Sequence, residues 1–298
     1  MGNGRALTTA TTSPAKPRNG ALTWLGVAPF FLFAFLFLIL PTLYLLVGAF
    51  QDATGAFTLQ NFVELGQPNI VAAYTISIKI SLASAVLGAV FGFFIAYAIV
   101  GGGLPPWVRA FVTTFSGVAS NFAGVPLAFA FLATLGRTGL VTALLANWFG
   151  FSLYQNGFNL LSFMGLTLTY LYFQIPLMVL ILTPALDGLK KEWREASSIL
   201  GASTWQYWTM IALPVLWPSI LGATILLFAN SFGAIATAYA LTGSSLNIVT
   251  ILLYAQIRGD VLHNPNLGFA LALGMVVITS LSNFAYLWLR ARADRWVK

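Results

Sequence analysis

Residues 22–50 read LTWLGVAPFFLFAFLFLILPTLYLLVGAF, a run of 29 residues that contains no charged side chain. A helix needs about 20 consecutive apolar residues to cross the hydrocarbon of a bilayer, so this run predicts a membrane-spanning helix. A secretory signal has a shorter apolar core followed by a small-residue cleavage site, and this run is too long to be one.

The composition extends that conclusion to the whole chain. Hydrophobic residues make up 59% of the 298 residues and charged residues only 7%. Soluble domains carry about 25% charged residues because their surfaces face water, and lipid-embedded chains form helices or closed barrels. The sequence therefore predicts an all-α, polytopic membrane protein. With no cysteine and a single histidine, disulfides and Cys- or His-rich metal sites are not expected.

Charged and turn-forming residues divide the rest of the chain into further spans. The expected spans are residues 22–50, 80–100, 110–135, 158–182, 220–241 and 267–289. Residues 140–149 are expected to form a short interfacial helix anchored by Trp148, and Pro176 is expected to kink the fourth span. These segments predict a six-helix transmembrane bundle over residues 21–298, after a disordered tail at residues 1–20.

Most of the positive charge falls on one side of this arrangement. The termini and two loops on that side contain Arg5, Lys16, Arg18, Arg109, Lys190, Lys191, Arg194, Arg290, Arg292, Arg295 and Lys298. The opposite loops contain Arg137 and Arg258, and Lys79 is expected near a membrane border. Because basic loops stay in the cytoplasm, both termini are predicted to be cytoplasmic. The net charge of +7 then has a topological origin, and no nucleic-acid partner is expected.

The cytoplasmic loop at about residues 187–218 differs from the others. Its first part places Leu189, Trp193 and Ile199 at helical spacing, which predicts an amphipathic helix that Gly201 ends. Ser203 is expected to cap a second helix, which Leu213-Pro214 would end. An apolar helix face in the cytoplasm fits either a groove on a partner protein or the lipid headgroups, and the pattern alone does not decide between them.

Part of this loop resembles a known signature. It contains Glu195-Ala196-Ser197, then three residues, Gly201, nine residues and Ile211-Ala212-Leu213-Pro214. This spacing is similar to the signature loop of binding-protein-dependent ABC importer permeases, with Ser197 where the family usually has Ala. The Pro-Ala-Leu-Asp run at residues 184–187 also resembles the residues that often precede that signature.

The resemblance implies a partner-driven transporter in the bacterial inner membrane. It implies that two ATP-binding cassette subunits dock on the loop, beside a second permease subunit and a periplasmic solute-binding protein. ATP and Mg²⁺ would then belong to the ATPase, with no cofactor and no enzymatic activity in this chain. The branch that it most resembles handles polyamines, iron, phosphonates and opines. The implied ATPase-coupling residues are Glu195, Ala196, Ser197, Gly201, Ala202, Leu213 and Pro214.

Polar residues within spans usually face a cavity or the bundle interior, so they are candidates for the translocation path. These candidates are Asn230, Ser231, Tyr239, Asn121, Tyr170 and Gln174. Each of them also fits the alternative role of a hydrogen bond between helices.

Two alternative functions, ion-coupled secondary transport and catalysis in the membrane, fit the sequence less well than import. An ion-coupled secondary transporter normally needs ionisable residues or broken helices in its spans, and the expected spans contain almost no ionisable residue. A membrane enzyme needs a catalytic cluster, and neither a metal-ligand cluster nor a Gly-x-Ser-x-Gly elbow is present. The chain also has no phosphate-binding loop ending in Gly-Lys-Ser/Thr, so ATP hydrolysis is expected on another chain.

Overall fold

A computed structural model describes residues 20–258 and 264–293 of the chain, and the regular secondary structure of these residues is helical. The chain divides into two compact units, residues 1–47 and 48–298. Six helical segments are long and apolar enough to span a membrane, which confirms the predicted number. They are Gly26–Ala49, Pro68–Gly101, Val125–Phe149, Phe163–Asp187, Thr204–Phe232 and Pro265–Trp288. The predicted tail lies outside the described residues except for Gly20, and the orientation of the termini stays a prediction.

The first unit contains one helical rod, made of α1 (Gly20–Ala34), a π-helical turn η1 (Phe35–Ile39) and α2 (Leu40–Ala49), which extends just past the unit boundary. Its large apolar side chains from Val27 to Val47 are exposed, apart from the half-buried Leu45. An apolar helix with no buried face is stable only where lipid covers it, which supports the first predicted span.

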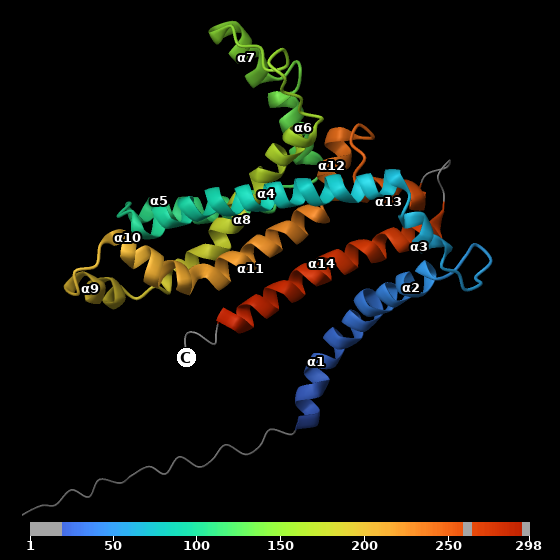
Figure 1. Ribbon diagram of the computed structural model, residues 1–298, viewed down its shortest axis with the longest axis horizontal. Helices are drawn as coiled ribbons and strands as arrows, with labels where there is room; N and C mark the ends of the chain where they lie inside the picture. Colours follow the sequence, from blue (N-terminus) through green and yellow to red (C-terminus); the bar gives the residue numbers. More distant parts are fainter. Residues whose placement is uncertain (1–19, 259–263, 294–298) are drawn as a thin grey trace, which may run out of the picture. The chain divides into compact units, whose positions relative to one another are not determined.

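The second unit contains the remaining helices (Figure 1). In chain order they are α3 (Gln60–Leu65), α4 (Pro68–Gly101), α5 (Pro106–Ala119), α6 (Val125–Leu135), α7 (Leu140–Phe149), α8 (Phe163–Asp187), α9 (Lys191–Ile199), α10 (Thr204–Tyr207), the π-helical turn η2 (Trp208–Ala212), α11 (Leu213–Phe232), α12 (Ile235–Thr242), α13 (Val249–Arg258) and α14 (Pro265–Ala293).

Helices α4 and α8 form the centre of this unit, and two glycines of α4 allow their backbones to approach closely. Gly88 and Gly92 are one turn apart and face Gln174 and Met178 of α8. A Cβ atom at Gly92 would lie 2.5 Å from the Cβ of Met178 and 2.9 Å from the Ile175 carbonyl oxygen. Membrane helices pack through such small-xxx-small pairs, since lipid provides no hydrophobic drive for helix association.

Gly92→Ala is therefore expected to destabilise the protein by about 1–3 kcal/mol, because overpacking at a backbone contact outweighs the helix propensity of alanine. Gly117→Ala is the matched control, since Gly117 lies inside α5 with no atom within 4 Å of its Cβ position. Thermal unfolding in detergent should show a lower Tm for the first variant and an equal or higher Tm for the second. Equal Tm values for Gly92→Ala and the unmodified protein would contradict the tight α4–α8 contact.

Helix α11 packs against both α4 and α8, and α14 packs against α11, α13 and α3. Buried side chains from α4, α8 and α11 form one apolar cluster, which includes Met178, Leu216 and Leu227. A second cluster joins α4, α6, α8 and α12, and a third joins α4, α11, α13 and α14. The core of the second unit is thus continuous along α4.

Three predicted spans have the wrong limits. The second begins at Pro68 instead of Ile80, which places Lys79 inside α4 and not just before a helix. The third, predicted as residues 110–135, is two helices separated by residues 120–124, and the third membrane-length segment is Val125–Phe149. The fifth, predicted as residues 220–241, breaks after Phe232 and continues as α12. Apolar composition alone did not reveal the two breaks.

The fourth and sixth spans agree with their predictions apart from a few residues at their ends. Helix α8 runs through Pro176 and Pro184 without interruption, so the expected kink does not break it. Residues 140–149 form α7, which confirms the predicted helix, and Trp148 is exposed. The interfacial position of α7 stays a prediction.

Candidate coupling loop and translocation hollow

The loop after α8 contains a helix with a well-defined end at Gly201. The Gly201 N–H donates to the Ser198 carbonyl oxygen at 3.0 Å, and the Ala202 N–H donates to that of Ser197 at 2.9 Å. These two bonds form a Schellman motif, which requires a left-handed residue. Gly201 has φ +77°, and its Cβ position has no atom within 4 Å. The predicted stop is confirmed, and backbone conformation rather than crowding requires glycine here.

The second loop helix also begins as predicted. Ser203 Oγ accepts from the Gln206 N–H at 3.3 Å, while the Ser203 N–H donates to Gln206 Oε1 at 2.7 Å. This reciprocal pair is a capping box. The prediction that Leu213-Pro214 ends this helix is wrong, because α10 continues through η2 into α11. In the wider π-turn the Leu213 N–H bonds to the Trp208 carbonyl, which lets the helix continue into Pro214 although proline has no N–H.

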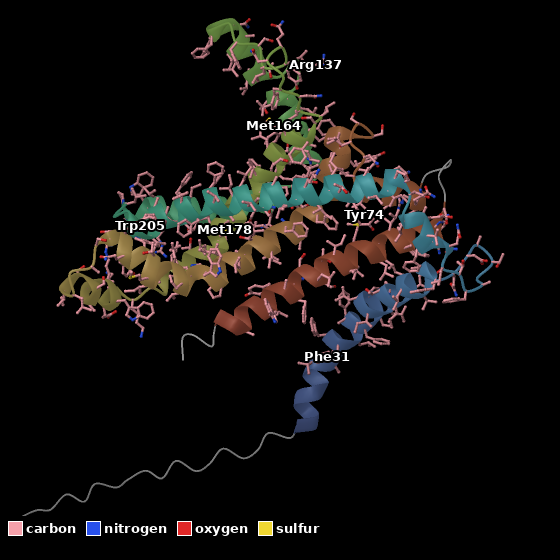
Figure 2. All side chains as sticks on the ribbon, viewed as in Figure 1. Phe31, Tyr74, Arg137, Met164, Met178 and Trp205 are labelled. Atoms are coloured by element: carbon pink, nitrogen blue, oxygen red, sulfur yellow. The ribbon has the colours of Figure 1, made fainter. Side chains whose placement is uncertain are left out.

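One end of α9 is apolar and exposed. Ile199 and Leu200 each expose 86% of their surface. Trp205 at the start of α10, labelled in Figure 2, exposes 76%. Trp193, nearer the start of α9, is half-buried. Exposed apolar residues that lie together indicate a binding surface, so this end of the loop is a candidate docking surface for a partner.

A tryptophan anchors the loop to the central helix. The ring of Trp208 lies edge-on to Tyr97 of α4, with ring centroids 4.9 Å apart, and also contacts Phe93 at 6.4 Å. Edge-to-face aromatic pairs add about 0.5–1.5 kcal/mol to the burial of the rings. Residues after α10 are therefore fixed to α4, whereas Ile199 and Leu200 stay available.

The predicted coupling residues divide into two groups. Glu195, Ala196, Gly201 and Pro214 are exposed, and Ala202 and Leu213 are half-buried. Ser197 is buried, and its hydroxyl donates to the Arg194 carbonyl oxygen at 2.8 Å. Ser197 therefore acts within the loop, whereas Glu195 and Ala196 are open to a partner.

The break between α5 and α6 and the break between α11 and α12 contact each other in the second unit. The Gly124 N–H, just before α6, donates to Thr237 Oγ1 of α12 at 2.7 Å. Gly124 has φ +76° and ψ −149°, a conformation essentially restricted to glycine. The two breaks border a hollow of about 470 Å³, which we call the translocation hollow. It is lined by Ser120, Ala123, Gly124, Phe173, Ala229, Asn230, Gly233, Ala234, Ile235, Ala236 and Thr237.

None of the described residues that line the translocation hollow carries a charged side chain. Its polar groups are the hydroxyls of Ser120 and Thr237, the Asn230 amide and backbone groups of the two breaks. Helices α6 and α12 both begin there without a side-chain cap. Irregular backbone at membrane depth is tolerated only where protein covers it or where it lines a cavity. Because transporters place broken helices of this kind around their substrate path, the hollow is a candidate for that path.

The predicted path residues do not all reach this hollow. Asn230 is exposed and lines it. Tyr170 is buried, and its hydroxyl donates to the carbonyl oxygen of Ala234, a lining residue, at 2.8 Å, which supports the break between α11 and α12. Gln174 is fully buried, and its Nε2 donates to the Leu227 carbonyl oxygen at 2.8 Å.

The other three candidates lie elsewhere. Ser231 is buried, and its hydroxyl is 3.1 Å from the Leu227 and Phe228 carbonyl oxygens. Tyr239 is half-exposed and packs on Tyr254 with ring centroids 5.2 Å apart. Asn121 is exposed, and its Nδ2 donates to the Gly117 carbonyl oxygen at 2.9 Å. For Gln174 and Ser231, helix–helix hydrogen bonding and core packing describe the structure better than a path.

Sequence reasoning missed the glycine and alanine part of the hollow. Asn230 was among the predicted path residues, but Ser120, Gly124, Ala229, Gly233 and Thr237, which also line the hollow, were not. The signal was present in Gly124-Val-Pro126 and in Gly233, since both are typical of a helix boundary. Within residues 20–258 and 264–293 no group of three or more His, Cys, Asp or Glu side chains could hold a metal ion.

The family model and the relatives that match this chain agree with one another. Residues 88–298 match the family described as "Binding-protein-dependent transport system inner membrane component". The chain is 29% identical over 161 residues to the molybdenum transport system permease protein ModB of Escherichia coli K12, covering 54% of this chain and 67% of ModB. It is 28% identical over 274 residues to the putative ferric transport system permease protein FbpB 1 of Haemophilus influenzae, covering 88% of this chain and 40% of FbpB 1.

A solved structure has the same fold. The chain superimposes on one chain of a bacterial ABC transporter involved in the import of the acidic polysaccharide alginate, with a TM-score of 0.70 and 18% identity. The superposition covers 93% of this chain and 96% of that chain.

Proposed function

This chain belongs to the family of binding-protein-dependent transport system inner membrane components, the permeases of ABC importers, and from that premise we propose how it works. Its second unit forms one half of a transmembrane path, and its loop at residues 187–218 receives force from an ATPase subunit. The exposed apolar end of α9 at Ile199 and Leu200 carries this proposal, because it is a surface that a partner must cover.

The partners follow from the same premise. Two ATPase subunits dock on the coupling loops, a second permease subunit completes the path, and a periplasmic binding protein delivers the solute. Glu195, Ala196 and Gly201 are the contact centre, since all three are exposed on the loop. Closure of the ATPases on ATP moves the loops together and turns the bundle outward, which is a rigid-body change between two packed states. Hydrolysis takes place on the partner, and this chain needs no cofactor.

The cargo is a small solute that the binding protein selects. The relatives are named for molybdenum and ferric transport. These names support the expected resemblance to iron permeases, and they do not support a polyamine-like cargo. Among the membrane-length helices described, the only acidic residue is Asp187, at the end of α8, so a polycation would find no buried partner there. Neutral polar groups of the translocation hollow let the solute pass without holding it.

The proposed site is the bacterial inner membrane, with both termini and the coupling loop in the cytoplasm. Basic residues at Lys190, Lys191 and Arg194 surround the start of α9, and such residues stay on the cytoplasmic side. A cysteine introduced at Ser198, which is exposed, should therefore react with a membrane-impermeant maleimide only from the cytoplasmic side.

Purification and reconstitution test the proposal. The tagged chain is purified from its host in mild detergent, its partners are identified by mass spectrometry, and the complex is placed in liposomes with candidate binding proteins and oxyanion or iron cargo. We expect an ATPase subunit to copurify and uptake to require ATP and the binding protein. A chain that purifies alone and drives uptake from an ion gradient without ATP would instead establish the alternative, an ion-coupled secondary transporter.

A further inference from the structure

One ion pair joins two segments that are far apart in the sequence. The Arg109 guanidinium, in the fourth position of α5, donates from Nη2 to Oδ2 of Asp187, the last residue of α8. Each side chain is 41% exposed. In the part of the chain that the structure describes, this is the only salt bridge between side chains.

Helix dipoles do not explain these charges. A cation is unfavourable near the amino end of a helix, and an anion is unfavourable near the carboxyl end. Arg109 lies near the amino end of α5 and Asp187 at the carboxyl end of α8, so each charge opposes the dipole of its own helix. A half-exposed pair also contributes little to global stability. What the pair does provide is a fixed contact between the two helix ends.

The two helix ends lead to the two candidate sites. Asp187 is the first residue of the coupling loop at residues 187–218, and α9 begins only four residues later, at Lys191. On the other side, α5 runs from Arg109 to Ala119 and is followed by Ser120 and Gly124, which line the translocation hollow. The rise of an α-helix places Ser120 about 16 Å along the axis from Arg109. Helix α5 also packs along α8, so the connection is continuous.

We propose that the Arg109–Asp187 pair is the link that transmits movement of the coupling loop to α5 and through it to the translocation hollow. This inference rests on the proposed function. Arg109 and Asp187 are positioning residues: the pair makes α5 follow the end of α8 when the loop moves. Without the pair, the loop still docks on the ATPase and hydrolysis continues, but α5 is held to α8 by packing alone and follows the loop less closely.

Charge reversal with a compensating swap tests the link in the complete complex in liposomes. The readout is the number of solute molecules imported per ATP hydrolysed, because a merely structural role would lower uptake and hydrolysis together. Arg109→Asp and Asp187→Arg are each expected to lower this ratio by about fivefold or more, the range of a typical coupling energy. The double variant Arg109→Asp/Asp187→Arg is expected to restore most of it. Its reversed charges favour both helix dipoles, so it should fold at least as well as the unmodified chain.

Asp187→Asn gives a variant of nearly the same shape in case a reversal prevents assembly. It should lower the ratio in the same direction by a smaller factor, with an unchanged Tm. An unchanged ratio in the assembled single variants, or a swap that rescues nothing, overturns this inference alone. An unmodified complex without ATP-dependent uptake overturns the proposed function, and this inference falls with it.

Discussion

Gly201→Asp is expected to abolish most ATP-driven uptake while leaving the protein folded and in the membrane. Gly201 ends α9 beside the exposed Ile199 and Leu200, and its Cβ position is open, so an added side chain meets a partner and not this chain. A charge left unpaired in a protein interface costs about 2–5 kcal/mol, so binding of the ATPase should weaken by about thirtyfold or more. Copurification of the ATPase and uptake in liposomes measure the two effects.

Gly150→Asp is the matched control. Gly150 caps the carboxyl end of α7 with φ +64°, and its Cβ position also has no atom within 4 Å. The two substitutions therefore carry the same backbone strain and the same charge, and only the loop differs. Gly150→Asp should keep normal uptake. If Gly201→Asp also kept normal uptake and bound its ATPase, the assignment of residues 187–218 as the coupling loop would be wrong.

Local signals in the sequence predicted the end of α9 and the start of α10 well. Gly201 and Ser203 act on residues within four positions of themselves, through the Schellman and capping-box bonds, so short-range pattern rules apply to them. The wrong prediction that Leu213-Pro214 ends the second loop helix also rested on a local rule. Proline normally ends or kinks a helix, but a π-turn anchored on Trp208 compensated for the missing N–H, and that anchor depends on α4.

The spans illustrate what hydropathy cannot predict. Six apolar segments follow from composition because lipid exposure imposes them, and six were found. The breaks at Gly124 and Gly233 keep the same apolar composition, so a hydropathy window passes over them. They are stabilised by contacts across the fold, such as Gly124 with Thr237 and Tyr170 with Ala234, which only tertiary structure can provide.

The same reason explains the mixed result for the path residues. A polar side chain in a span signals either a cavity or a helix contact, and the one-dimensional pattern is identical for both. Asn230 lines the translocation hollow, whereas the hydroxyl of its neighbour Ser231 bonds to backbone carbonyls of α11 and, at 3.4 Å, to that of Ser81 on α4. Neighbouring helix positions differ by about 100° around the axis, so only the packing of α11 on α4 and α8 decides between them.

Ala229→Trp is expected to block uptake from inside the membrane while ATP hydrolysis continues. Ala229 lines the translocation hollow, and an indole in a space of about 470 Å³ would narrow it strongly. The coupling loop and the Arg109–Asp187 pair stay intact, so the ATPase should still be driven through its cycle. We expect uptake to fall by about tenfold or more, the effect of roughly 1.4 kcal/mol on a barrier to passage, with ATP hydrolysis within about twofold of normal.

Ala285→Trp separates blockage from the general effect of a bulky residue in a membrane helix. Ala285 is exposed on α14 and lines none of the hollow. It should keep both uptake and hydrolysis, because lipid accommodates a tryptophan on an exposed helix face. Normal uptake by Ala229→Trp would place the path elsewhere, and an equal loss of uptake and hydrolysis would mean that the substitution disturbs assembly. Only a selective loss of uptake supports a solute passing between the two helix breaks, because the ATPase would then work against a closed path.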